Sequence, residues 1–102
     1  MRKITAKMYK AFCEGKEASL GNTVVTKDEV ILFGHPIVKR HPKHPKTKIL
    51  VRTWGYETTT TKDRLGAFVP VYQKNHVWYV GDDAWEDNYD WTSFDWDYNV
   101  KN

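Results

Sequence analysis

The feature that most constrains this fold is a succession of short apolar segments joined by turns too short for a crossover. Residues 30–40 read VILF, then the turn GHP, then IVKR, and residues 69–80 read VPVYQ, then KNH, then VWYV. Parallel strands need a connection of about a dozen residues or more, so strands joined in this way must be antiparallel. Further apolar segments at 17–26 and 48–54 add strands. The pattern predicts a twisted antiparallel sheet of four to six strands.

Two helices are expected beside this sheet. In residues 3–14 the apolar side chains of Ile4, Met8 and Phe12 recur every four residues, and Gly15 follows as a helix stop. A second helix of about two turns is expected from the threonine run at 58–61 onward, with Thr60 as its capping residue and Asp63 three residues later. Antiparallel strands with helices packed on one face make an α+β domain.

The size of the chain limits its organisation to one domain. It has 102 residues, which we assign to a single domain, 1–102, with an acidic-aromatic C-terminal extension at 86–102. One cysteine, Cys13, allows no internal disulfide, and neither a signal peptide nor a membrane span is expected from the sequence. A reducing cytoplasm is the predicted location.

Charge is divided unevenly along the sequence. Residues 1–74 carry fifteen Lys and Arg against six Asp and Glu, whereas residues 75–102 carry one against seven. The two parts have net charges of +9 and −6, which give the formal +3 of the whole chain. Either the acidic end folds back on the basic part, or each forms a charged surface of its own.

The acidic end has the alternation of a β-strand. In NYDWTSFDWDYN, residues 88–99, rings alternate with acids, which predicts an extended segment with aromatic side chains on one side and carboxylates on the other. We hypothesise that it contacts a partner, or else that its acids protect a sheet edge from aggregation. The candidate acidic contacts are Asp87, Asp90, Asp95 and Asp97, and the candidate aromatic contacts are Tyr89, Trp91, Phe94, Trp96 and Tyr98.

A second candidate surface lies in the basic part. Between Ile31 and Tyr56 there is no acid, and the cations there could neutralise phosphates while an aromatic ring stacks on a base. The alternatives are a solvated loop or a basic surface that meets an acidic protein. The candidate nucleic-acid contacts are Lys39, Arg40, Lys43, Lys46, Lys48, Arg52 and Trp54.

Catalytic and metal-binding patterns are weak. His35, His41 and His44 lie close together in sequence but beside prolines in a predicted loop, and a zinc site wants ligands on rigid elements. Cys13 lies on the predicted helix with no nucleophile signature around it. We therefore expect no metal, no cofactor and no enzymatic activity.

Several stretches resemble a group of short accessory proteins of tailed bacteriophages. They are AFCEGKEASLGNT, VILFGHPIVKR, GYETTTTKDRLGAF and WYVGDDAW, in the order found in that group, and the resemblance covers roughly residues 10–86. The HPKHPK loop and the acidic-aromatic end depart from it. The resemblance implies a phage accessory protein of one α+β domain. With the acidic end, it suggests a monomer or homodimer that binds a host protein or ribonucleoprotein complex in the host cytoplasm. Such a protein would inhibit a defence system in the manner of an anti-CRISPR. A nucleic-acid-binding accessory protein is the alternative.

Overall fold

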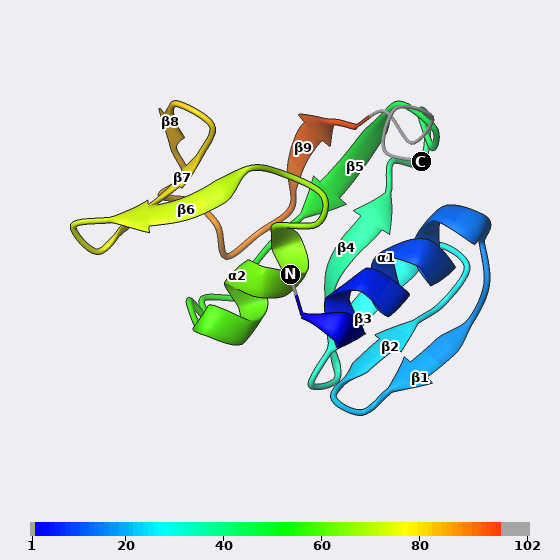
Figure 1. Cartoon of the computed structure of the whole chain (residues 1–102). Coiled ribbons are helices and arrows are strands. Elements are labelled where there is room, and N and C mark those ends of the chain that lie inside the picture. Colours follow the sequence, from blue (N-terminus) through cyan, green and yellow to red (C-terminus); the bar gives the residue numbers. More distant parts are fainter. Residues whose placement is uncertain (1, 97–102) are drawn as a thin grey trace.

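Two helices and nine strands make up the described part of the chain, residues 2–96, in a computed structural model (Figure 1). The helices are α1 (Lys3–Glu14) and α2 (Thr59–Leu65). The capping residue of α2 is Thr58, whose hydroxyl accepts a hydrogen bond from the Thr61 amide at 3.1 Å, and not the expected Thr60. The strands are β1 (Ala18–Leu20), β2 (Thr23–Val25), β3 (Glu29–Leu32), β4 (His35–Arg40), β5 (Lys48–Val51), β6 (Val71–Lys74), β7 (Val77–Val80), β8 (Asp83–Ala84) and β9 (Thr92–Asp95). Within residues 2–96 no helix is long and apolar enough to cross a bilayer.

The strands form two antiparallel sheets. The larger has the order β1-β2-β3-β4-β5-β9, and the smaller has the order β6-β7-β8. Neighbours in the larger sheet follow one another in sequence until β5, which pairs with the distant β9. The predicted α+β class and the antiparallel pairing are confirmed.

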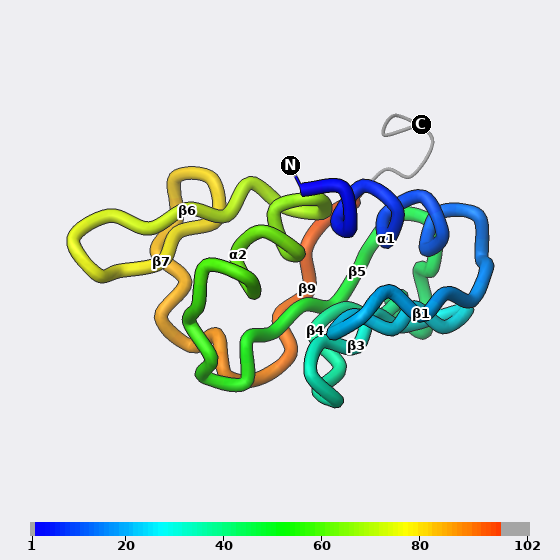
Figure 2. The backbone as a smooth tube through the Cα atoms, turned by 60° about the horizontal axis from the view of Figure 1, so that its bottom comes forward, coloured from blue at the N-terminus to red at the C-terminus, as the bar shows by residue number. Residues whose placement is uncertain are grey.

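One face of the larger sheet packs against the helices. Val30, Val38 and Val51 lie in register on neighbouring strands and are buried, together with Met8 and Phe12 of α1. Figure 2 shows α1 lying along one side of this sheet. Because side chains alternate across a strand, Glu29, Lys39 and Leu50, which are in register one position away from these valines, point to the opposite face. We call that opposite side the outer face.

A buried arginine joins the two helices to the sheet. Arg64 of α2 is 1% exposed and donates hydrogen bonds to Thr5 of α1 (2.8 Å) and to Thr23 of β2 (3.0 Å). It also pairs with Asp63 at 2.9 Å, and Thr5 donates to the same carboxylate. This network fixes α2 beside α1 on the inner face of the sheet.

The β3–β4 hairpin is confirmed, but its turn lies earlier than the expected Gly34-His35-Pro36. It consists of Phe33 and Gly34, with φ values of 51° and 81°, so the strand resumes at His35. Pro36, which was expected in the turn, therefore occupies the second position of the internal strand β4. A register shift opposite it, between Val30 and Ile31, locally interrupts the ladder in which proline cannot donate.

The acidic-aromatic segment joins the larger sheet. Strand β9 pairs with β5 from Lys48 opposite Asp95 to Val51 opposite Thr92. Trp96 follows it and is 3% exposed in the core, where its ring lies 5.7 Å from that of Phe12. Residues 97–102 lie outside the described residues, and with them the predicted contacts Asp97 and Tyr98.

Candidate functional site

The structure brings the acidic end onto the basic strand. Lys48 Nζ lies 2.6 Å from Asp95 Oδ1, and Arg52 Nη1 lies 3.9 Å from Asp90 Oδ1. The hydrogen bond and charge of Lys48 hold the pKa of Asp95 below its usual value. Two of the four candidate acids therefore neutralise cations of the same chain. Of the two alternatives that the charge division left open, the fold-back is found for Asp90 and Asp95.

A stacked arginine forms the centre of the outer face. The guanidinium carbon of Arg52 lies 3.6 Å from the ring centre of Trp54 and 3.9 Å from that of Trp91. Its Nε donates to the carbonyl oxygen of Pro36 at 3.2 Å, and Trp54 Nε1 donates to the same oxygen at 2.6 Å. Burial lowers the pKa of Arg52, but an arginine keeps its charge in proteins. The guanidinium thus fixes both indoles in one orientation.

Further side chains extend this centre. Lys39 Nζ lies 4.6 Å from the ring centre of Trp91, and the exposed Tyr89 packs edge-on against Trp54 with ring centres 6.0 Å apart. We define the tryptophan–arginine surface by six residues: Lys39, Arg52, Trp54, Tyr89, Asp90 and Trp91. The two sets of candidate contacts thus meet here, since three of these residues come from the basic segment and three from the acidic-aromatic one.

A row of aromatic rings continues from this surface. The imidazole of His35 lies 5.6 Å from the ring of Trp54 and 5.2 Å from the ring of Tyr56, measured between centres. Tyr56 is 54% exposed. The row leads from the outer face to the edge of the β3–β4 hairpin.

The backbone at Trp54 is strained. Trp54 has a φ of 61° in the turn that it forms with Gly55, whose φ is 83°. A left-handed conformation costs a non-glycine L-residue about 1–2 kcal/mol. Strain of this kind persists where the surroundings impose it, and it is concentrated at functional sites. Here the Pro36 carbonyl and Arg52 hold the indole in place.

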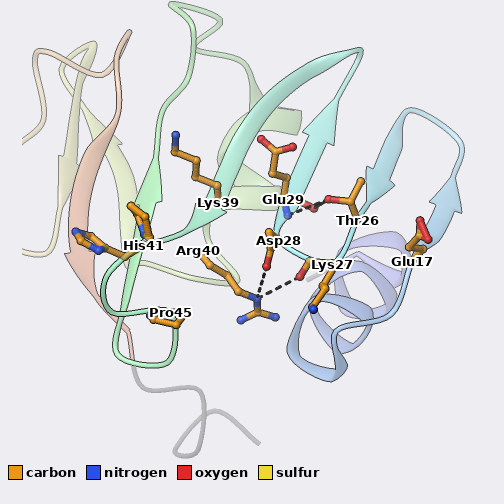
Figure 3. Close-up of a pocket in the computed structure, with 10 residues that line it drawn as sticks. Glu17, Thr26, Lys27, Asp28, Glu29, Lys39, Arg40, His41 and Pro45 are labelled. Atoms are coloured by element: carbon orange, nitrogen blue, oxygen red, sulfur yellow. Dashed lines mark hydrogen bonds and ion pairs between the residues drawn. The ribbon is translucent and has the colours of Figure 1, made fainter.

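Charges on the outer face are balanced. Glu29 of β3 is opposite Lys39 of β4 in the sheet register, and Figure 3 shows both side chains projecting from the same side of the strands. Asp90 and Asp95 likewise accompany Arg52 and Lys48. On this face each of the three cations Lys39, Lys48 and Arg52 is therefore accompanied by a carboxylate.

The remaining basic candidates lie elsewhere. Arg40 turns away from the outer face into a groove of about 720 Å³ (Figure 3), where Nε donates to the Lys27 carbonyl at 3.2 Å and lies 3.8 Å from Asp28. Its guanidinium also covers the ring of Phe12 at 4.1 Å. The exposed Lys43 and Lys46 lie on the loop between β4 and β5. Lys46 lines a further pocket together with Arg40, so the loop cations and Arg40 are neighbours, apart from the candidates on the outer face.

The aromatic candidates are also divided. Phe94 faces inward and packs edge-on against Trp85 with ring centres 5.7 Å apart, and Trp96 lies in the core. Tyr89 and Trp91 lie on the outer face. Asp87 is exposed in the segment before β9. Only the early part of the acidic-aromatic segment therefore offers rings to a partner within residues 2–96.

No metal centre is present among the described residues, where no three His, Cys, Asp or Glu side chains gather as ligands. His41 and His44 face each other in the proline loop with ring centres 5.2 Å apart, while His35 lies in the aromatic row. Cys13 is 7% exposed, and burial raises the pKa of its thiol.

The sequence reasoning missed His35, Tyr56 and Phe33 as surface residues. One signal could have pointed to Phe33, and the same signal marks Trp54, which was already a candidate. Tight turns with positive φ usually carry Asn-Gly or Asp-Gly, but here Phe33-Gly34 and Trp54-Gly55 occupy them. A bulky ring in such a turn is locally unfavourable, so it points to a role outside the turn itself.

Comparison with known proteins gives a family. The family model described as "Kyanoviridae Gp96 protein" matches residues 1–101. Comparison with curated proteins gave no match, and comparison with solved structures gave none.

Proposed function

We propose that this chain, which belongs to the Kyanoviridae Gp96 family of phage proteins, is a non-catalytic binding protein. Its tryptophan–arginine surface contacts a protein component of a host macromolecular complex in the host cytoplasm. The observation that carries the proposal is the stacking of Arg52 between Trp54 and Trp91 on the outer face of the sheet.

The composition of the surface favours a protein partner. Trp, Tyr and Arg are the residues that dominate binding energy at protein interfaces, where a few anchors outweigh many neutral contacts. The indoles and the guanidinium are already held by one another and by the Pro36 carbonyl, so little side-chain freedom is lost on binding. Asp90, Lys39 and Lys48 around them supply a polar rim of both charges.

In its finer form, the proposal is that binding inhibits a bacterial defence complex, as an anti-CRISPR protein does. A small rigid domain inhibits such a complex by occupying a surface that the complex needs for its target. The test is the plating efficiency of a targeted phage on cells that express the chain. Expression should restore plating, and Trp91→Ala should abolish the effect. Plating that is unchanged by the wild-type chain contradicts inhibition of the defence system tested.

Binding itself is tested with a matched pair of variants. Trp91→Ala removes one wall of the arginine stack, and Tyr72→Ala removes an exposed ring from the distant β6–β7 hairpin. Tagged wild type and both variants are incubated with host lysate, and captured proteins are quantified by mass spectrometry. A protein captured by the wild type should be reduced at least tenfold by Trp91→Ala and retained by Tyr72→Ala. Equal capture by both variants contradicts the assignment of this surface.

Nucleic-acid binding is the second candidate function. It is favoured by the acid-free segment from Ile31 to Tyr56 and by the exposed Lys43 and Lys46 of its loop. Fluorescence titration of single-stranded DNA and RNA at 50 and 200 mM salt separates the two candidates. Contact with several phosphates would weaken binding steeply between these concentrations. We expect that neither DNA nor RNA binds more tightly at 50 mM than at 200 mM salt. Nucleic-acid binding with a steep salt dependence would favour this second function over the first.

A further inference from the structure

A partly enclosed cavity lies next to the tryptophan–arginine surface. Its volume is about 310 Å³, at the lower end of the range for ligand pockets. It lies between the β3–β4 hairpin, the loop before α2 and the first turn of α2. Its walls are formed by Leu32, Phe33, His35, Ile37, Thr53, Tyr56, Thr58 and Thr61.

The chemistry of the walls selects an uncharged occupant. None of the lining residues is Asp, Glu, Lys or Arg. The threonine hydroxyls are engaged within the protein, since Thr53 donates to Asn88 at 2.7 Å and the Thr58 and Thr61 hydroxyls lie 3.0 Å apart. The walls left for a ligand are the threonine methyl groups, Leu32, Ile37 and the rings of Phe33, His35 and Tyr56. In this lining only the His35 imidazole and the Tyr56 hydroxyl offer polar atoms, so a base, which needs partners all along its polar edge, is matched less well than an apolar ring.

Two exposed rings stand at this cavity. Phe33 is 64% exposed and Tyr56 is 54% exposed, and both belong to its wall. Phe33 also holds a left-handed φ of 51° in a two-residue turn where Asn or Gly is preferred. The chain thus keeps a ring there against its local preference. Such a cost is expected where a side chain serves a contact, because nothing in the hairpin itself requires it.

We propose that this cavity receives one aromatic side chain of the partner protein that the tryptophan–arginine surface contacts. This inference rests on the proposed function. The cavity and the surface are continuous through His35, whose ring contacts both Trp54 and Tyr56. An inserted ring would meet Phe33, His35 and Tyr56 in the edge-on and offset arrangements that aromatic pairs prefer. An anchor in a pocket beside a flat aromatic surface is the arrangement typical of interface hot spots.

The first arm of the test needs no partner. Indole, as a probe for a tryptophan side chain, is titrated into the full chain and followed by amide NMR, with adenine as the comparison. Indole should saturate at millimolar concentration and shift amides of residues 32–37 and 53–61, and adenine should shift them far less. The double variant Phe33→Asn with Tyr56→Ala should weaken indole binding roughly tenfold. Indole shifts that never saturate, or an affinity unchanged in the double variant, overturn the proposal.

The second arm asks whether the partner uses the pocket. The same double variant should capture the host protein at least tenfold more weakly than wild type, while Tyr72→Ala captures it normally. Both replaced side chains are exposed, so the melting temperature should stay within a few degrees of wild type or rise. Saturable indole binding with unchanged capture refutes use of the pocket and leaves the proposed function intact. The proposed function is tested separately by Trp91→Ala, which is expected to lose specific capture of the host protein.

Discussion

Replacing the buried Arg64 by methionine should destabilise the fold strongly. Methionine keeps most of the buried chain but removes the cation, which donates to Thr5, Thr23 and Asp63 at 2.8–3.0 Å. The carboxylate of Asp63, with a side chain 20% exposed, then loses its ion pair. Removal of one partner from a buried pair costs about 3–5 kcal/mol, and the partial exposure of Asp63 places this case near the lower value.

The effect is measured by thermal unfolding followed by circular dichroism. A loss of about 3 kcal/mol lowers the melting temperature of a domain of this size by roughly 12–24 °C. The double variant Arg64→Met with Asp63→Asn should recover part of this loss, because it no longer leaves a charge unpaired. A decrease below about 4 °C for Arg64→Met, or a double variant no more stable than the single one, would refute the role assigned to this network.

Three further predictions concern single side chains. Because Lys48 lowers the pKa of Asp95, this pair stabilises the fold above the usual aspartate pKa, and the stabilisation is lost as pH falls through the lowered pKa. Carboxyl NMR should show a higher Asp95 pKa in Lys48→Met than in wild type. An unchanged Asp95 pKa contradicts the pairing. Buried Cys13 should resist iodoacetamide at pH 8 until the chain unfolds, and rapid alkylation of the native protein, seen by mass spectrometry, contradicts its burial. His76→Gly should raise the melting temperature by about 4 °C, since φ at this turn position is 66°, and a decrease contradicts the turn assignment.

Local signals predicted much of the fold. The helix at Lys3–Glu14 and the β6–β7 hairpin lie where their apolar spacing and turn residues place them. Alternation also predicted the burial in β9, where Phe94 faces inward and Asp95 outward. These features depend on neighbours within a few residues, so sequence reasoning can find them.

The pairing of β5 with β9 could not be found in this way. Lys48 and Asp95 are far apart in sequence, and an alternating pattern defines the faces of a strand without naming its partner. That one pairing turned two apparent surfaces into one, because it placed Trp91 beside Arg52 and Trp54. The position of Pro36 inside the sheet depended likewise on the register shift in β3, which composition does not reveal.

Site-specific photo-crosslinking in infected cells tests the central claim most directly. A benzoylphenylalanine is placed at Tyr89 on the tryptophan–arginine surface or, as a control, at Tyr72 on the β6–β7 hairpin; both positions are exposed. The account predicts that Tyr89 crosslinks to one host protein and that Tyr72 does not. Crosslinks of Tyr89 to nucleic acid, or the same protein pattern from both positions, would contradict it.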